Sequence, residues 1–154
     1  MKGLSLKLYI DGASRGNPGR AGVGICIKGE DGEVKAALSR YLGHKTNNEA
    51  EYWGLLLGLR EVHRLGGDVV RIFTDSQLVE RQINGLYRVK DPKLKSLHKA
   101  VTESLRAFSS FTMESIPREQ NGEADHLANR AIDRRIERER EKGGGEGEEM
   151  VAPH

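Results

Sequence analysis

The chain has 154 residues, a single cysteine and a formal net charge of +2, and 31% of its residues are charged. A chain of this length forms one domain with its own core and needs no disulfide framework. Cys26 lies in an apolar run, so we expect a small core residue in a reducing compartment. No apolar run approaches the ~20 residues of a membrane span, and the N-terminus lacks a signal-peptide pattern. We therefore expect a cytoplasmic protein without membrane contact.

The first third of the chain predicts three antiparallel strands. Leu6, Leu8 and Ile10 alternate with polar residues, which is the period of a strand, and this strand is expected to end at Asp11. After a turn-rich segment, residues 21–28 form the second predicted strand. Asp31-Gly32 is typical of a tight hairpin turn, so residues 33–42 should return as a third strand.

The remainder predicts helices that alternate with strands. A helix is expected over residues 49–65, capped by Asn47 or Asn48 and ended by Gly66-Gly67. The other predicted elements are a strand at 69–74, a helix from Ser76, a helix from Pro92 to about 108, a strand at 111–116 and a last helix from Asn121. This order predicts an α/β fold with one mixed sheet flanked by helices.

The C-terminal end differs in composition from the rest of the chain. Four glutamates and one lysine give residues 141–154 a net charge of −3, which leaves +5 for residues 1–140. We expect a globular domain over 1–140, fraying near its end, and a disordered Gly/Glu-rich tail over 141–154. A mildly basic body is compatible with a phosphate-bearing partner but does not prove one.

Four acidic residues occur where functional sites collect. Asp11 and Asp75 follow predicted strands, Glu51 lies in the first turns of the long helix, and Asp125 lies near the start of the last helix. Each has an ordinary alternative, as a turn former, a helix-start residue or a solvated side chain. Packing several acids together is costly unless a cation neutralises them. Neither Cys/His spacing nor a paired thiol offers a competing zinc site.

The motifs around these acids resemble type 1 ribonuclease H. They are, in order, Y-I-D-G-A-S-R-G-N-P-G, T-N-N-E-A-E-Y, T-D-S-Q and N-G-E-A-D-H-L-A, and the resemblance covers about residues 4–135. It implies a ribonuclease H-like fold, with a five-stranded mixed sheet of three antiparallel strands followed by two parallel strands. It also implies a metal-dependent endonuclease that hydrolyses the RNA strand of RNA/DNA hybrids and leaves 5′-phosphate products.

The resemblance assigns Asp11, Glu51, Asp75 and Asp125 as the catalytic and metal-binding acids. Two Mg²⁺ ions roughly 4 Å apart, with Mn²⁺ as a substitute, would activate a water and stabilise the leaving oxygen. Asp11 would bridge both ions and Asp125 would complete the second site. Glu49, the other acid of T-N-N-E-A-E-Y, is more simply a helix N-terminal residue favoured by the helix dipole.

Polar residues next to the acids match the family's substrate contacts. Reading the RNA strand requires contacts to its 2′-hydroxyls. The matching positions are Asn17, Asn47, Asn48, Ser76 and Gln77, and Thr46, together with Asn17, matches a pocket for a phosphate of the DNA strand. Each of these residues also has a local alternative as a turn or cap residue.

Two features depart from the family pattern. The segment N-G-L-Y-R-V-K-D-P leaves no room for the basic extension that many members carry, so this looks like a short form. Arg130, Arg134 and Arg135 could compensate, although a solvated helix face is the simpler reading. Many members also have a histidine in the loop before the last acid, where this chain has Arg118. Arginine stays protonated and cannot act as a base, but it can hold a phosphate, so we include Arg118 among the catalytic residues.

Two other functions stay open from the sequence. One is a non-catalytic nucleic-acid-binding module on the same fold, which the presence of all four acids disfavours. The other is a related nuclease that also cuts double-stranded RNA. We expect a monomer, with an RNA/DNA hybrid as its partner.

Overall fold

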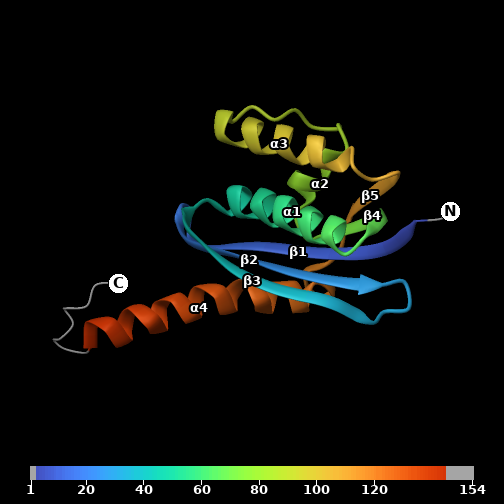
Figure 1. Ribbon diagram of the computed structural model, residues 1–154. Coiled ribbons are helices and arrows are strands. Elements are labelled where there is room, and N and C mark those ends of the chain that lie inside the picture. Colours follow the sequence, from blue (N-terminus) through green and yellow to red (C-terminus); the bar gives the residue numbers. More distant parts are fainter. Residues whose placement is uncertain (1–2, 145–154) are drawn as a thin grey trace.

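The computed structural model describes residues 3–144, which form one five-stranded sheet with helices on both faces (Figure 1). The strands are β1 (Leu4–Gly16), β2 (Gly19–Gly29), β3 (Val34–Lys45), β4 (Gly67–Thr74) and β5 (Ser110–Ser115). The helices are α1 (Asn47–Arg64), α2 (Gln77–Ile83), α3 (Pro92–Leu105) and α4 (Gly122–Gly144), and a single 3₁₀ turn at Arg118–Gln120 precedes α4.

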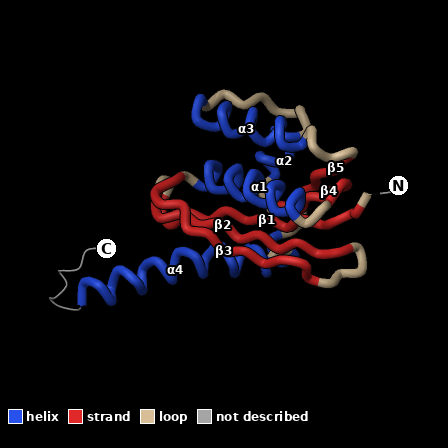
Figure 2. Tube along the Cα trace, viewed as in Figure 1, coloured by secondary structure: helices blue, strands red, loops and turns tan. Residues whose placement is uncertain are grey.

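The sheet has the strand order β3-β2-β1-β4-β5, which confirms the predicted mixed topology. The pairs β1/β2 and β2/β3 are antiparallel, whereas β1/β4 and β4/β5 are parallel. Figure 2 shows the three long strands of the meander beside the two shorter ones. The parallel pairs are reached by crossovers through α1 and through α2 and α3, as parallel strands require.

The first strand is longer than the sequence predicts. β1 does not end at Asp11 but continues to Gly16, and Asp11 pairs with Gly24 of β2. The expectation was wrong because the residues after Asp11 are typical of turns. Pairing with β2 keeps them extended up to the contact between Gly16 and Gly19.

The main core lies between the sheet and α1. Alternate residues of β1 and β4 face this helix, and the largest of them are fully buried: Leu6, Leu8, Ile10, Val70 and Ile72. From α1 they meet Tyr52, Leu55, Leu59 and Val62. Helix α3 packs on α1 from outside, so α1 is covered on two sides. Burial of α1 between the sheet and α3 fixes the position of Glu51 in its first turns.

Thr46, and not Asn47 or Asn48 as predicted, caps α1. Its hydroxyl accepts a hydrogen bond from the Glu49 N–H, and the Glu49 carboxylate accepts one from the Thr46 N–H, at 3.1 and 2.9 Å. This reciprocal capping box satisfies two backbone donors of the helix start. It also confirms Glu49 as a helix N-terminal acid.

Helix α4 lies alone on the opposite face of the sheet (Figure 1). Its first half packs directly on β2, because Gly22 and Gly24 leave room for the helix backbone. A Cβ on Gly24 would lie 2.0 Å from the Ala124 carbonyl oxygen, and one on Gly22 would lie 2.7 Å from the Ala128 carbonyl oxygen. The glycines of β2 therefore seat the turn of α4 that carries Asp125.

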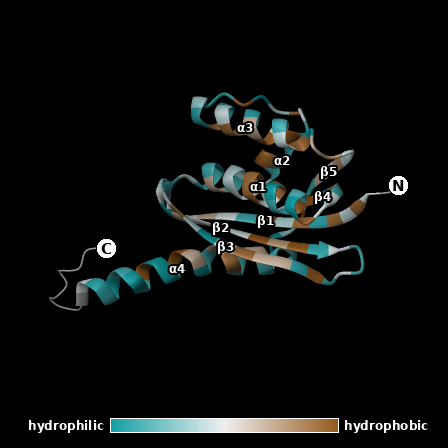
Figure 3. Cartoon of the chain, viewed as in Figure 1, coloured by the Kyte–Doolittle hydropathy of each residue, from teal (hydrophilic) through white to brown (hydrophobic). Residues whose placement is uncertain are grey.

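The second half of α4 is hydrophilic and projects beyond the sheet (Figure 3). The helix continues through Gly144, past residue 140 where the sequence predicted fraying. Arg20 of β2 contacts Glu139 at 2.7 Å, and Arg135 contacts the same carboxylate at 3.1 Å. In this part of α4 the contacts are therefore ion pairs between exposed side chains and not core packing. The rest of the predicted tail, 145–154, lies outside the described residues.

Within residues 3–144, no helix combines the length and the apolar composition that crossing a lipid bilayer requires.

Candidate active site

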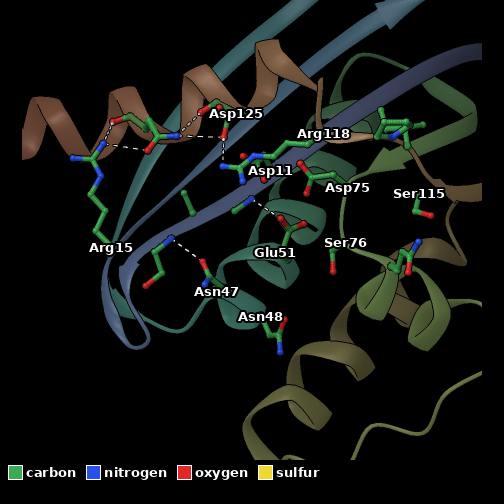
Figure 4. A pocket seen from close by; sticks show the side chains of 17 residues that line it. Asp11, Arg15, Asn47, Asn48, Glu51, Asp75, Ser76, Ser115, Arg118 and Asp125 are labelled. Carbon is green, nitrogen blue, oxygen red and sulfur yellow. Dashed lines mark hydrogen bonds and ion pairs between the residues drawn. The ribbon is translucent and has the colours of Figure 1, made fainter. Parts of the chain in front are cut away.

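Three acids meet at one edge of the sheet, each from a different element. Asp11 lies on β1, Asp75 directly follows the neighbouring parallel strand β4, and Glu51 lies in the first turns of α1. One carboxylate oxygen from each residue lies within 4.8 Å of those of the other two. They line an open cleft with a volume of about 810 Å³, and Figure 4 shows the side chains around it. Asp11 and Glu51 are buried and Asp75 is half-buried, and these three residues are called the buried trio below.

Glu51 is held by two hydrogen bonds to the sheet. Its Oε2 accepts from the Gly12 N–H at 2.9 Å, and its Oε1 accepts from the Thr74 hydroxyl at 3.1 Å. The hydrogen bond from the Gly12 N–H requires a glycine at this position, because a Cβ on residue 12 would lie 2.3 Å from the Ala50 carbonyl carbon. The glycine after Asp11 thus allows α1 to approach β1 closely enough for the two acids to share a site.

The buried trio concentrates negative charge in a poorly solvated place. Burial, and then the charges of Glu51 and Asp75, raise the pKa of Asp11 far above its usual value. Burial also raises the pKa of Glu51 to about 7, although the Gly12 N–H favours its ionised form. The pKa of Asp75 is raised by burial as well, partly offset by Asn121 and by the positive charge of Arg118. Without a cation the group is therefore held partly protonated near neutral pH.

Asp125 and Arg118 lie at the rim of the cleft. The Asp125 side chain is 33% exposed and that of Arg118 is 81% exposed, and Arg118 Nη2 lies 3.8 Å from Asp125 Oδ1. The structure brings Asp125 to the cleft with the buried trio, as the sequence predicts, but outside the closest group of oxygens. Arg118 also lines the cleft, within reach of both Asp75 and Asp125.

The predicted substrate-contact residues divide into two groups. Asn47, Asn48, Ser76 and Gln77 line the same cleft as the acids. Asn17 and Thr46 do not. Thr46 caps α1, and Asn17 Oδ1 accepts a hydrogen bond from the Asn47 N–H at 3.0 Å, which holds the β1–β2 turn against the start of α1. Ser76 caps α2 through the Val79 N–H.

Three residues near the acids were missed by the sequence analysis. Arg15 and Asn129 line the cleft beside Asp125. Asn121 is buried, and its amide donates to the Ile10 carbonyl at 2.8 Å, which ties the approach to α4 to the strand of Asp11. Of these three, only Asn129 could have been predicted from the sequence, because it follows Asp125 by four residues and so lies on the same side of a helix.

The donor set of the cleft suits a hard divalent cation. It offers only carboxylate, hydroxyl and amide oxygens near the buried trio, without a thiolate or imidazole among its lining residues. Mg²⁺ prefers oxygen ligands and needs few carboxylates because it keeps several waters. A bound cation would also offset the repulsion that raises the pKa values of the trio. The residues present therefore fit a divalent metal site.

Comparisons with known proteins agree with this arrangement. The family profile described as "Reverse transcriptase-like" matches residues 9–131. Ribonuclease HI of Halobacterium salinarum is 39% identical over 132 residues, which are 86% of this chain and 66% of that protein. Ribonuclease H of Pseudomonas fluorescens is 32% identical over 145 residues, covering 84% of this chain and 91% of that protein. A bifunctional protein of Mycobacterium tuberculosis is 40% identical, but the chain spans only 36% of its length.

Solved structures give the same family. The crystal structure of RNase H1 from Halobacterium salinarum matches with a TM-score of 0.82 at 40% identity, over 84% of this chain and 98% of that one. LC11-RNase H1 in complex with an RNA/DNA hybrid also matches with a TM-score of 0.82, at 37% identity, over 85% and 99% of the two chains. On fold, motifs and the converging acids together, the chain belongs to the type 1 ribonuclease H family.

Proposed function

We propose that this protein is an endonuclease that hydrolyses the RNA strand of RNA/DNA hybrids and leaves 5′-phosphate ends. The observation that carries the proposal is the convergence of three carboxylates within 4.8 Å, with Asp125 in the same cleft. The relative with the bound RNA/DNA hybrid supports the substrate class. The presence of all four acids argues against a binding module without catalysis.

The buried trio and Asp125 would hold two Mg²⁺ ions, for which Mn²⁺ can substitute. When bound, such ions supply positive charge at the scissile phosphate and lower the pKa of a coordinated water. The protein supplies fixed oxygens. Glu51 is oriented by Gly12 and Thr74, and Asp11 is fixed within the paired region of β1. Because these groups are positioned by rigid elements, little reorganisation is needed when substrate binds.

Arg118 is an exposed cation that lines the cleft beside Asp125, and we assign it a role on the substrate phosphate. Its guanidinium lies 3.8 Å from Asp125 and carries donors that suit a phosphate oxygen. It stays protonated at ordinary pH, so it serves to hold the phosphate or offset developing charge and not to remove a proton.

Polar residues that line the cleft can read an RNA strand. Asn47, Asn48 and Gln77 carry amides that both donate and accept, which is what recognition of a 2′-hydroxyl requires. Thr46 and Asn17 can bind a phosphate of the DNA strand without giving up their local bonds. The Thr46 hydroxyl accepts from Glu49, so its own proton stays free to donate, and Asn17 uses its oxygen toward Asn47 while its NH₂ group remains a donor.

One gel tests the proposal. End-labelled RNA/DNA hybrid, double-stranded RNA and double-stranded DNA of one sequence are incubated with Mg²⁺, Mn²⁺ or chelator. Asp75→Asn serves as the inactive control, and Glu114→Gln, an exposed acid on β5, serves as the matched active one. We expect internal cleavage of the RNA in the hybrid with either metal, and none in chelator.

Two results would contradict the proposal. Robust cleavage in chelator would exclude a metal-dependent mechanism, and binding of the hybrid without cleavage would favour the non-catalytic module. Cleavage of double-stranded RNA beside the hybrid would widen the substrate range to that of the related nuclease considered from the sequence.

A further inference from the structure

A chain of three side chains links the tip of the sheet to Asp125. Arg15, near the end of β1, contacts the Asn129 side-chain oxygen through Nη2 at 3.1 Å. The Asn129 NH₂ group in turn donates to the Asp125 carbonyl at 3.0 Å and to Asp125 Oδ1 at 3.3 Å. Figure 4 shows this path running from Arg15 along α4 to the rim of the cleft.

The chemistry of Arg15 fixes which way the Asn129 amide points. A guanidinium has only donors, so the amide atom that faces it must be the oxygen. The NH₂ group must then face Asp125, where a carboxylate oxygen can accept from it. If the amide turned round, two donors would meet at Arg15 and two acceptors would meet at Asp125. Both contacts thus select the same orientation.

We propose that Asn129, oriented by Arg15, is a positioning residue for Asp125. The inference rests on the proposed function, because Asp125 is the rim acid of the proposed metal site. Asp125 needs such support more than the buried trio does, since its side chain is 33% exposed and is not enclosed by the core. The Asn129 amide restrains the Asp125 carboxylate through Oδ1, the oxygen that also lies 3.8 Å from Arg118 Nη2.

Arg15 makes a second contact with α4, and control variants can therefore distinguish the positioning of Asn129 from general stabilisation of the helix. Arg15 Nη1 also pairs with Asp133 at 2.7 Å, one turn beyond Asn129. Asp133→Asn removes that ion pair and keeps the Asn129 contact. Arg20→Met is a matched control, because Arg20 joins β2 to α4 through Glu139 without a connection to Asp125. Both controls should keep near wild-type activity.

The test combines steady-state kinetics on an RNA/DNA hybrid with calorimetric titration of Mn²⁺ into the substrate-free protein. Asn129→Ala should lower kcat about tenfold and weaken Mn²⁺ binding by a similar factor, with KM within about twofold, as expected for loss of an outer partner of a metal ligand. Arg15→Met should give a smaller loss, and Arg15→Lys, which keeps a pure donor, should restore it. Arg15→Glu, an acceptor, should be worse than Arg15→Met.

The double variant decides whether Arg15 acts through Asn129. Arg15→Met should have no further effect on kcat in the Asn129→Ala background, because coupled residues are not additive. An Asn129→Ala protein with kcat and Mn²⁺ affinity both within twofold of wild type would overturn the inference. So would Arg15→Met raising KM equally in both backgrounds, which would make Arg15 a substrate contact. If the wild type binds Mn²⁺ but cleaves no hybrid, the proposed function fails, while the Mn²⁺ affinity of Asn129→Ala still decides the positioning role.

Discussion

The buried trio and the rim of the cleft are held in different ways. Asp11 and Glu51 are buried on β1 and α1, Asp75 directly follows the core strand β4, and Glu51 is fixed by hydrogen bonds to Gly12 and Thr74. At the rim, Arg118 is largely exposed and Asp125 is partly exposed, and the Asp125 carboxylate is oriented by the side chains of Asn129 and Arg118. The trio is therefore a fixed part of the fold, whereas the rim can adjust to a substrate.

The concentration of negative charge in the trio carries an energetic cost. Burial raises the pKa values of all three acids, so their ionised forms are disfavoured until a cation is bound. Substitutions in the trio should accordingly remove activity and relieve repulsion together. Substitutions at the rim should change the rate without a gain in stability.

The largest effect is expected from Asp11→Asn. It should lower kcat on an RNA/DNA hybrid by at least about a thousandfold, on the order of 4 kcal/mol of transition-state stabilisation. The same variant should melt at a higher temperature than wild type in chelator, because Glu51 and Asp75 can then ionise without a third carboxylate beside them. Steady-state kinetics and a thermal melt measure the two effects. A variant that keeps a tenth of wild-type activity at saturating Mg²⁺ would remove Asp11 from the site.

Arg118→Ala should have a smaller effect on the rate. We expect kcat to fall about ten- to a hundredfold, or roughly 1.4–2.7 kcal/mol, because one phosphate contact is lost while the acids remain. The melting temperature should not change, since the side chain is 81% exposed. Arg118→His should recover part of the rate with a new dependence on pH. Activity of Arg118→Ala within twofold of wild type would make this residue a bystander.

Gly12→Ala tests how closely α1 must approach β1. The added Cβ would lie 2.3 Å from the Ala50 carbonyl carbon, so the start of α1 has to move and Glu51 moves with it. We expect a loss of about 1–3 kcal/mol in unfolding free energy, measured by urea denaturation, and a fall in kcat. Gly122→Ala is the matched control, because a Cβ there meets nothing within 4 Å. Equal behaviour of the two variants would show that the close approach is not required.

Deletion of residues 141–154 should have the smallest effect. Glu141, Lys142 and Gly143 are exposed, so the unfolding free energy should change by less than ~0.5 kcal/mol. Hybrid affinity at low salt should rise, because four glutamates no longer repel phosphate. A large drop in melting temperature would show that this segment contributes to the fold.

The sequence predicted the trio better than its surroundings. Periodicity placed Asp75 after a strand and Glu51 early in a helix, and the motif resemblance joined them with Asp11 and Asp125. The extent of β1 was not predictable, because pairing with β2 overrides the turn preference of residues 12–16. The contact of Arg15 with Asn129 was hidden for a similar reason. It joins residues 114 apart in the chain, and no local pattern reports such a pair.

We infer that the buried trio is a cation site whose charges are unfavourable without a metal. Its most direct test is the melting temperature between pH 5 and pH 8, in chelator and in Mg²⁺. The folded pKa of Glu51 is about 7 against an ordinary 4.5, and those of Asp11 and Asp75 are also raised. A carboxyl group whose pKa is raised in the folded state makes its full contribution to stability below its unfolded pKa. That contribution is lost as the pH rises through its folded pKa.

In chelator, the melting temperature of wild type should therefore fall by several degrees from pH 5 to pH 8, relative to the Asp11→Asn variant, on the order of 2–4 °C per kcal/mol for a chain of 154 residues. Mg²⁺ should restore it increasingly toward pH 8, because the metal binds the ionised carboxylates. A wild-type curve that runs parallel to that of Asp11→Asn and does not respond to Mg²⁺ would contradict the claim.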